Sequence, residues 1–259
     1  MQNKYLLVDL SNFIFRFATS KKPANTIAEE VYSNIISFQE SLACTNTIVL
    51  LDKHGSDFRK KLYPEYKGNR KKEGKFYEDL KEFFKKLPTI VKFLNVYLPV
   101  LSFSGIEADD VIWYLCDKFD KRCVILSTDA DLLQCGVVQF SYTKRKFITL
   151  EGQGAENITQ FITAKCLAGD NSDNIKGLER VGLKTALKVL KKYGCDDYEC
   201  LLYKIPQNTK SKIERRILDG CEIHDRNKSL VDLEAVNKII ITEEIREEID
   251  GILEEYVDE

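Results

Sequence analysis

The sequence predicts an α/β protein in which a central, mostly parallel sheet is flanked by helices and followed by a helical region. Short apolar runs alternate with amphipathic stretches throughout the first half of the chain. Two of these runs, KYLLVDL and TIVLLD, have an acidic residue at or next to their end, and from about residue 156 the apolar spacing becomes helical. Strand–helix–strand alternation favours a parallel sheet, because parallel strands need a crossover connection that is usually a helix.

The individual elements follow from the spacing of apolar residues. Residues 4–10 (KYLLVDL) and 47–52 (TIVLLD) predict buried strands, with a helix over 27–43 between them. The first half then predicts a strand over 95–103, a helix over 109–119, and strands over 122–127, 137–142 and 146–150. The second half predicts helices over 156–169, 181–194 and 209–231. We expect an α/β core over residues 1–168 and a helical region over residues 169–259.

Composition narrows the class of protein. The chain of 259 residues is 44% apolar and 31% charged, which is ordinary for a soluble protein. No stretch is long and apolar enough to span a bilayer, and the N-terminus (MQNKYLLVDLSNF) lacks a signal peptide's apolar core. We therefore expect a cytoplasmic protein, monomeric and without a membrane partner.

Cysteine and histidine usage argues against two kinds of site. None of the eight cysteines forms a C-x-x-C motif, and the chain has only two histidines. A zinc site and a histidine-activated nucleophile are therefore poorly supported. We expect the cysteines to be reduced core thiols.

Charge is distributed unevenly along the chain. Residues 53–92 contain 13 Lys and Arg against 6 Asp and Glu, and residues 184–216 contain 9 against 4. The tail over 242–259 contains 1 basic and 9 acidic residues. A single basic run is usually a solvated helix face, but two of them beside a separate acidic cluster favour a nucleic-acid partner.

Nine acidic residues at the ends of predicted strands and helices form the candidate metal site. They are Asp9, Asp52, Glu107, Asp109, Asp110, Asp129, Asp131, Asp170 and Asp173. Each alone has a structural explanation, as a helix cap or an Asx turn. A cap needs one acceptor, however, and GIEADD supplies three acids while STDAD supplies two. Converging carboxylates need cations, and oxygen ligands without His or Cys select Mg²⁺ or Mn²⁺. Two such ions suit phosphodiester hydrolysis.

Two basic segments are candidates for binding phosphates. GLERVGLKTA (177–186) fails the Walker A pattern, because Leu183 separates Gly182 from Lys184. A hairpin between helices there would expose backbone N–H groups to a DNA phosphate, although plain helix packing remains the alternative. In YKGNR, Tyr66 could stack on an unpaired base while Lys67 and Arg70 meet phosphates.

Taken in order, these motifs resemble the 5′→3′ exonuclease/flap endonuclease family, and the compact length resembles its bacteriophage members. The motifs are VDLSNFIFRF, LLD, FRKKLYPEYKGNR, GIEADD, STDADLL and AGDNSDNIKGLERVGLKTA. The resemblance implies the family's PIN-like nuclease fold and a structure-specific nuclease that needs two or more divalent ions. Such an enzyme cuts DNA near the junction of a 5′ single-stranded flap or end with duplex, and an RNA/DNA hybrid is a further candidate substrate.

The resemblance also assigns roles to individual residues. It makes the nine acids metal ligands, directly or through water, and Lys67 and Arg70 the catalytic cations on the scissile phosphate. It places DNA contacts at Arg16, Tyr66, Lys165, Gly177, Gly182, Lys184 and Thr185. Residues of about 68–94 would form a helical arch. Residues 177–194 would form a helix–three-turn–helix element that grips duplex DNA around a bound K⁺.

Two other functions fit parts of the sequence. A PIN-like ribonuclease shares an acidic α/β metal site but needs neither the helix hairpin nor YPEYKGNR. A non-catalytic DNA-junction binding protein would use the same acids structurally.

Overall fold

The computed structural model describes residues 4–69 and 73–256, which fall into two compact units. The first unit comprises residues 4–56, 73–148 and 240–256, and the second comprises residues 57–69 and 149–239. The second unit therefore interrupts the first twice in sequence. None of the described helices has the length and apolar character needed to cross a membrane.

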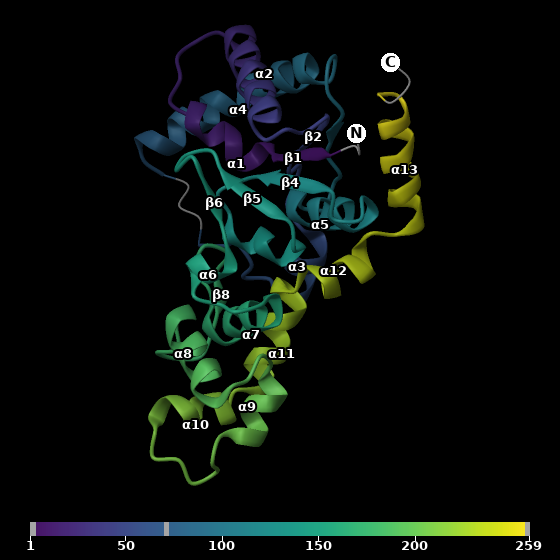
Figure 1. Cartoon of the computed structure of the whole chain (residues 1–259). Coiled ribbons are helices and arrows are strands. Elements are labelled where there is room, and N and C mark those ends of the chain that lie inside the picture. The colour runs from purple at the N-terminus through teal and green to yellow at the C-terminus, as the bar shows by residue number, and fades with distance from the viewer. Residues whose placement is uncertain (1–3, 70–72, 257–259) are drawn as a thin grey trace. The chain divides into compact units, whose positions relative to one another are not determined.

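Six described strands form the sheet of the first unit, in the order β3-β2-β1-β4-β5-β6 (Figure 1). They are β1 (Tyr5–Asp9), β2 (Asn46–Leu50), β3 (Val100–Leu101), β4 (Cys123–Leu126), β5 (Val138–Ser141) and β6 (Lys146–Ile148). All neighbours pair in parallel except β5 and β6, which are antiparallel. The predicted mostly parallel sheet is confirmed. Successive crossovers run outward from β1 to β2 and β3, and the next strand, β4, returns to the other side of β1.

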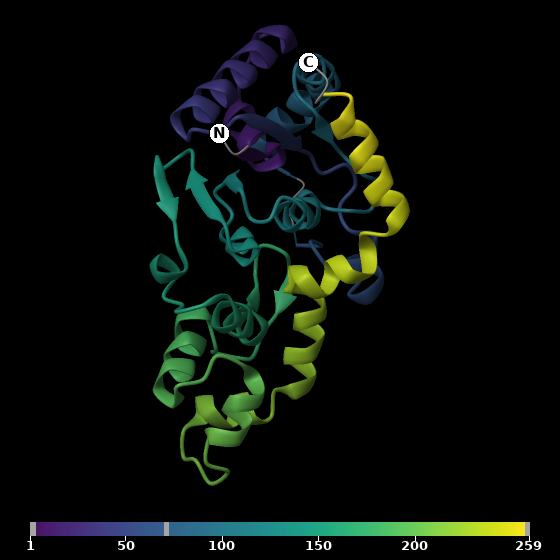
Figure 2. The ribbon, with the colours of Figure 1, turned by 45° about the vertical axis from the view of Figure 1, so that its right-hand side comes forward.

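Helices cover this sheet because their apolar stripes face it. The first unit contains α1 (Leu10–Ile14), α2 (Ala24–Ser41), α4 (Lys75–Leu94), α5 (Ala108–Lys118), α13 (Glu243–Glu254), and the 3₁₀ helices η1 (Phe15–Phe17) and η2 (Ala130–Cys135). Helices α2 and α4 pack together, and Phe83, Ile90 and Leu94 of α4 join the core with Val8 and Val49 of the central strands. Figure 2 shows α13, in yellow, running along this unit.

One predicted strand is much shorter than expected. The sequence predicts a strand over 95–103, but only Val100 and Leu101 pair in the sheet. The N–H groups of Asn95 and Leu98 instead donate to carbonyls in the last turn of α4. Pro99 then provides no N–H for a ladder, so pairing begins only after it.

The second unit is almost entirely helical. It contains α3 (Asp57–Leu62), α6 (Leu150–Gln153), α7 (Ile158–Ala168), α8 (Leu183–Tyr193), α9 (Tyr198–Lys204), α10 (Lys212–Leu218), α11 (Cys221–Val231), α12 (Leu233–Ile240), and the short hairpin of β7 (Gly169–Asp170) and β8 (Ile175–Lys176). Helix α7 packs against both α8 and α11. Residues 63 and 66 of the segment after α3 bury their tyrosine rings beside Cys166 and Leu230.

The expectation of reduced thiols is wrong for two cysteines. Cys195 and Cys200 form a disulfide, with Cα atoms 5.6 Å apart. The chain turns tightly between α8 and α9, because Gly194 ends α8 in the left-handed conformation and Asp197 caps α9. This turn brings two cysteines five positions apart within bridging distance. Of the other six, five are buried and Cys221 is exposed.

His224 of α11 makes the stability of the second unit depend on pH. Its ring stacks on Tyr198 at 4.2 Å, and burial lowers the pKa of the imidazole below its usual value. The folded state therefore favours the neutral ring. The stability that this provides is complete above the unfolded pKa of 6.5 and is lost as the pH falls below it.

We predict that the wild type loses more unfolding free energy than His224→Phe when the pH falls from 7.5 to 5.5. Phenylalanine keeps a ring beside Tyr198 but does not titrate. Urea denaturation followed by circular dichroism measures the difference. Equal pH dependence of wild type and His224→Phe would refute the assignment.

Candidate active site

Three of the predicted ligands of the first unit lie at the carboxyl edge of its sheet. Asp9 is the last residue of β1, Asp52 follows β2, and Asp129 follows β4. These three strands are parallel neighbours, so their ends meet at one edge. The sheet changes winding direction between β1 and β4, which is where sites form in open α/β sheets. The sequence prediction of acids at this edge is confirmed.

Asp9 is the buried centre of this group, with only 5% of its surface exposed. Its carboxylate accepts hydrogen bonds from the Ser127 hydroxyl at 2.8 Å and from the Asn12 N–H at 3.0 Å. Burial raises the pKa of Asp9 to about 7; these two hydrogen bonds oppose the rise, and the negative charges of Asp52 and Asp129 add to it. The folded chain therefore holds a carboxyl group that neutral donors only partly stabilise as an anion.

The acids that begin α5 form a reciprocal cap. The Glu107 side chain accepts from the Asp110 N–H, and the Asp110 side chain accepts from the Glu107 N–H. The Asp52 side chain accepts from the Ala108 N–H at 2.7 Å, so it also contributes to this helix start. The expectation that capping explains only one acid of GIEADD is therefore wrong, because a capping box uses two. Asp109 is half-buried on the same turn.

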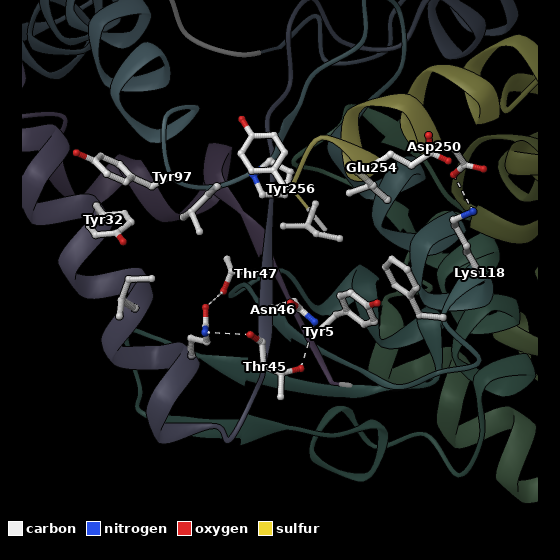
Figure 3. Close-up of a pocket in the computed structure, with 17 residues that line it drawn as sticks. Tyr5, Tyr32, Thr45, Asn46, Thr47, Tyr97, Lys118, Asp250, Glu254 and Tyr256 are labelled. Atoms are coloured by element: carbon white, nitrogen blue, oxygen red, sulfur yellow. Dashed lines mark hydrogen bonds and ion pairs between the residues drawn. The ribbon is translucent and has the colours of Figure 1, made fainter. Parts of the chain in front are cut away.

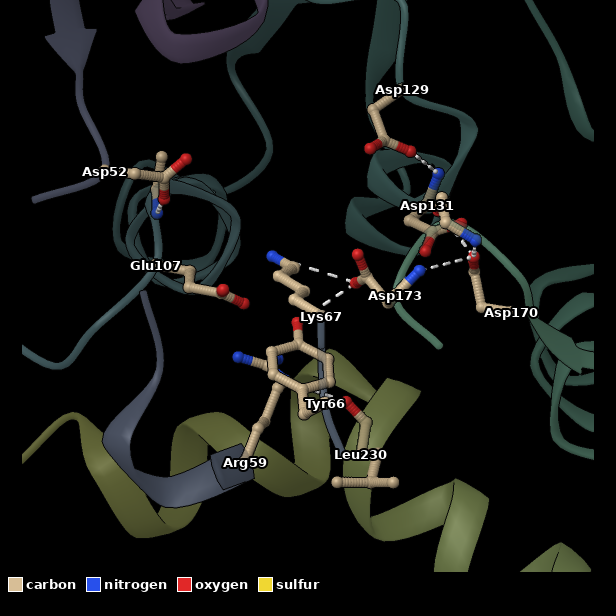
Figure 4. A network of polar contacts seen from close by, with 12 residues as sticks. Asp52, Arg59, Tyr66, Lys67, Glu107, Asp129, Asp131, Asp170, Asp173 and Leu230 are labelled. Atoms are coloured by element: carbon tan, nitrogen blue, oxygen red, sulfur yellow. Dashed lines mark hydrogen bonds and ion pairs between the residues drawn. The ribbon is translucent and has the colours of Figure 1, made fainter. Parts of the chain in front are cut away.

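The loop after β4 holds Asp129 and Asp131. Asp129 caps η2 by accepting from the Asp131 N–H at 2.9 Å (Figure 4). Its own N–H donates to the Ser127 hydroxyl. Ser127 thus joins Asp9 to Asp129 through one hydroxyl group. Sequence reasoning missed Ser127, although it directly precedes the TDAD motif at the strand end.

In the second unit, Asp170 is paired with Lys165. Their oxygen and nitrogen are 2.7 Å apart, and only 7% of Lys165 is exposed. Burial opposes ionisation of Asp170, but the Lys165 ammonium and hydrogen bonds from Ser172 outweigh it and lower the pKa to about 2. This buried ammonium is directed at a carboxylate, and the predicted DNA contact of Lys165 stays a prediction.

Asp173 organises the YKGNR segment. The Tyr66 hydroxyl donates to its carboxylate at 3.0 Å, the Lys67 ammonium lies 3.8 Å away, and the Lys67 N–H donates to the Asp173 carbonyl (Figure 4). Lys67 adopts a positive φ of 56°, a conformation that this backbone hydrogen bond helps to hold. Tyr66 is 5% exposed and packs beside Cys166, and its predicted stacking on a base stays a prediction. Arg70 lies outside the described residues.

A buried arginine that sequence reasoning missed supports this segment. Arg59 of α3 is 3% exposed, and its Nε–H donates to the Leu230 carbonyl in α11 (Figure 4). Arg59 lies in the sequence FRKKL, whose three basic residues predict an exposed, charged surface. Nothing in the local pattern distinguishes it from its exposed neighbour Lys60.

Of the residues predicted to bind DNA in the helix–three-turn–helix element, one is closely packed and the others are exposed or half-buried. A Cβ at Gly177 would lie 2.1 Å from the Ala168 carbonyl, so Gly177 is required for backbone packing. Its predicted DNA contact stays a prediction. Gly182 precedes α8 with open space around its Cα, Lys184 is exposed, and Thr185 is half-buried on the first turn of this helix. Arg16, in the first unit, is exposed and hydrogen-bonds Asn34 while its guanidinium lies over Phe13.

The carboxylates do not form a ready-made metal cage. Among residues 4–69 and 73–256, no three His, Cys, Asp or Glu side chains converge closely enough to hold one ion. Glu107, Asp110 and Asp129 accept backbone N–H bonds at the helix starts. The donor set is nevertheless composed of oxygen atoms, with a buried carboxylate at its centre, and so fits hard divalent cations.

Comparison with known proteins identifies the same family along most of the chain. The model of the 5′-3′ exonuclease N-terminal resolvase-like domain matches residues 4–160, and that of the 5′-3′ exonuclease C-terminal SAM fold matches residues 157–247. The chain is 34% identical over 245 residues to the flap endonuclease of Escherichia phage T5, covering 88% of this chain and 82% of that one. It is 32% identical over 213 residues to the 5′-3′ exonuclease of Aquifex aeolicus, covering 75% and 71%.

A solved structure extends this similarity. The crystal structure of a variant of the bacteriophage T5 flap endonuclease with DNA and metal ions has a TM-score of 0.85 and 30% identity. It covers 96% of this chain and 98% of that one. Another crystal structure of the T5 enzyme contains zinc.

Substitution of Asp9 can distinguish the cost of burying its charge from the effect of binding a metal ion. Its raised pKa means that its contribution to stability is present near and below pH 4 and is lost as the pH rises through about 7. In EDTA, we expect Asp9→Asn to gain stability relative to wild type by about 2 kcal/mol between pH 5 and pH 8. Added Mg²⁺ should stabilise the wild type at pH 8 but not the variant.

Thermal unfolding with and without Mg²⁺ measures both effects. Asp117→Asn, at an exposed position of α5, is the matched control and should behave as wild type. Two results would contradict the electrostatic assignment of Asp9. One is a stability difference between Asp9→Asn and wild type that does not change with pH, and the other is equal stabilisation of the two proteins by Mg²⁺.

Proposed function

Because this chain belongs to the 5′-3′ exonuclease family, we propose that it is a divalent-metal-dependent 5′ nuclease that acts both as a 5′→3′ exonuclease and as a 5′-flap endonuclease on DNA. The observation that carries this proposal is the group of carboxylates at the ends of β1, β2 and β4, centred on buried Asp9. The proposed roles of this nuclease are in DNA replication and DNA repair. We place it in the cytoplasm as a monomer, with RNA/DNA hybrids as a further candidate substrate.

Asp9, Asp52, Glu107, Asp109, Asp110, Asp129 and Asp131 of the first unit are the proposed ligands, and Mg²⁺ or Mn²⁺ the proposed ions. Divalent ions bound there would supply positive charge to the scissile phosphate and lower the pKa of a nearby water. The chain itself positions the acids, because Ser127 orients Asp9 and the helix start orients Glu107 and Asp110. Metal binding would also offset the charge that burial penalises at Asp9.

Lys67 and Arg70 are the proposed cations that contact the scissile phosphate. Asp173 and Tyr66 hold the Lys67 backbone and side chain in place before any substrate arrives, so a phosphate contact would cost little side-chain ordering. Asp170 and Asp173 remain proposed ligands through water, since Lys165 and Lys67 already balance their charge.

The start of α8 is the proposed grip on duplex DNA. The helix N-terminus offers backbone N–H groups, Gly182 leaves the approach open, and Lys184 adds a charge on the first turn. A bound K⁺ between this turn and a phosphate belongs to the same proposal. Residues 68–94 are the proposed arch; Phe83, Ile90 and Leu94 in its second half belong to the core of the first unit.

We predict that Lys67→Ala lowers the cleavage rate of a labelled 5′-flap DNA in Mg²⁺ by about 100-fold, because a cation at the reacting phosphate is lost. Single-turnover assays measure the rate, and EDTA should abolish cleavage altogether. Lys61→Ala, an exposed lysine of α3, should cut at nearly the wild-type rate. Intact flap DNA at every wild-type concentration would reject the proposed nuclease, and cleavage of RNA alone would favour a ribonuclease.

We predict that Lys184→Ala weakens binding to duplexes of different sequence equally and reduces the salt slope of log K by about one. The variant loses one phosphate contact and the counterion released with it. Fluorescence anisotropy in Ca²⁺, at several salt concentrations, measures the slope. Lys238→Ala, an exposed lysine of α12 paired with Glu234, should leave the slope unchanged. A wild-type slope for Lys184→Ala would count against the α8 grip.

A further inference from the structure

The first unit contains a cavity of about 520 Å³ that the proposed nuclease does not use. It is lined by the starts of β1 and β2, by α2, by residues 97–99, by the end of α5 and by α13 (Figure 3). All of these elements belong to the same unit. The floor is formed by polar residues that begin β2, including Asn46 and Thr47.

This cavity lies at the opposite ends of the elements that carry the carboxylates. Tyr5 lines the cavity at the start of β1, whereas Asp9 ends that strand about 13 Å away. Helix α5 shows the same relation, because it begins beside Glu107 and ends at Lys118 in the cavity wall. A ligand in the cavity would therefore leave the carboxylates uncovered.

The charges in the cavity wall are unbalanced. Its charged residues are Lys118, Asp250 and Glu254, which give one cation for two carboxylates. Lys118 pairs with Asp250 at 2.7 Å, and Glu254 lies one helical turn further along α13 (Figure 3). A ligand that brings one positive charge would complement this wall.

Aromatic rings surround the same space. Tyr5 stacks on Phe119 with ring centroids 3.8 Å apart, and Tyr32 lies 5.1 Å from Tyr97. Tyrosine faces attract cations and also accept apolar side chains. Tyr97 is 53% exposed and its neighbour Val96 is 67% exposed, so the apolar surface continues outside the cavity. Exposed apolar surface of this kind is typical of protein-binding sites.

We propose that this cavity docks a peptide segment of a partner protein in which a Lys or Arg side chain is flanked by apolar residues. The basic side chain lies between the tyrosine rings and Glu254, and the flanking apolar side chains pack on Tyr32, Tyr97 and Leu253. The volume exceeds that of any single side chain, which is why a segment rather than one residue fits. A partner bound here could accompany the chain during DNA cleavage.

The test uses the full-length ¹⁵N-labelled protein and the peptide acetyl-Leu-Arg-Leu-amide, followed by NMR. We expect saturable shifts of cavity residues such as Tyr32, Tyr97 and Leu253. Glu254→Lys should weaken binding by about tenfold or more, because it reverses the charge that receives the arginine. Acetyl-Leu-Glu-Leu-amide should cause no shifts at the cavity.

The matched control is Glu247→Lys, which makes the same charge change at an exposed position of α13 outside the cavity wall. It should bind the arginine peptide as wild type does. Absence of cavity shifts with the arginine peptide, equal loss in both variants, or equal binding of the two peptides would each overturn the proposal. The inference does not rest on nuclease activity, and Glu254→Lys should cut flap DNA at the wild-type rate.

Discussion

The burial of the Asp9 carboxylate is the constraint on which the first unit depends. A strand that ends in an acid between two other acidic strand ends places charge where water is scarce. Ser127 and the Asn12 N–H stabilise this charge only in part, and the pKa remains near 7. The sheet supplies the stability that permits such a residue, because apolar side chains such as Val8 and Val49 fill its interior. The site therefore holds negative charge that its hydrogen bonds only partly stabilise, and the proposed divalent ions would supply the compensating positive charge.

The predicted metal ligands of the second unit, unlike Asp9, have lysine partners within that unit. Asp170 has a buried lysine partner, and Asp173 holds Tyr66 and Lys67. These carboxylates are balanced by the chain itself, so they act first as organisers of the basic segment. The first unit carries the proposed metal ligands at the edge of its sheet. The second unit holds Lys67, the proposed phosphate contact, beside Asp173.

Much of this was predictable because the signals are local. Apolar runs predicted β1, β2 and β4, with acids at or shortly after their ends, and the parallel sheet brought these acids to one edge. The sequence could not show that Tyr66 and Lys165 are buried, because burial of a polar side chain depends on helices distant in the chain. The packing role of Gly177, the Cys195–Cys200 bridge and the cavity beside α13 likewise arise from tertiary contacts.

Crystallography with Mn²⁺ would show whether Asp9 binds a divalent ion, because anomalous scattering locates the ions without assuming any activity. We expect at least one Mn²⁺ within about 2.5 Å of an Asp9 carboxylate oxygen, with further carboxylates from the ends of β2, β4 or the start of α5 around the same ion or beside it. Ions bound only at other acids, with Asp9 still bonded solely to Ser127 and Asn12, would contradict it.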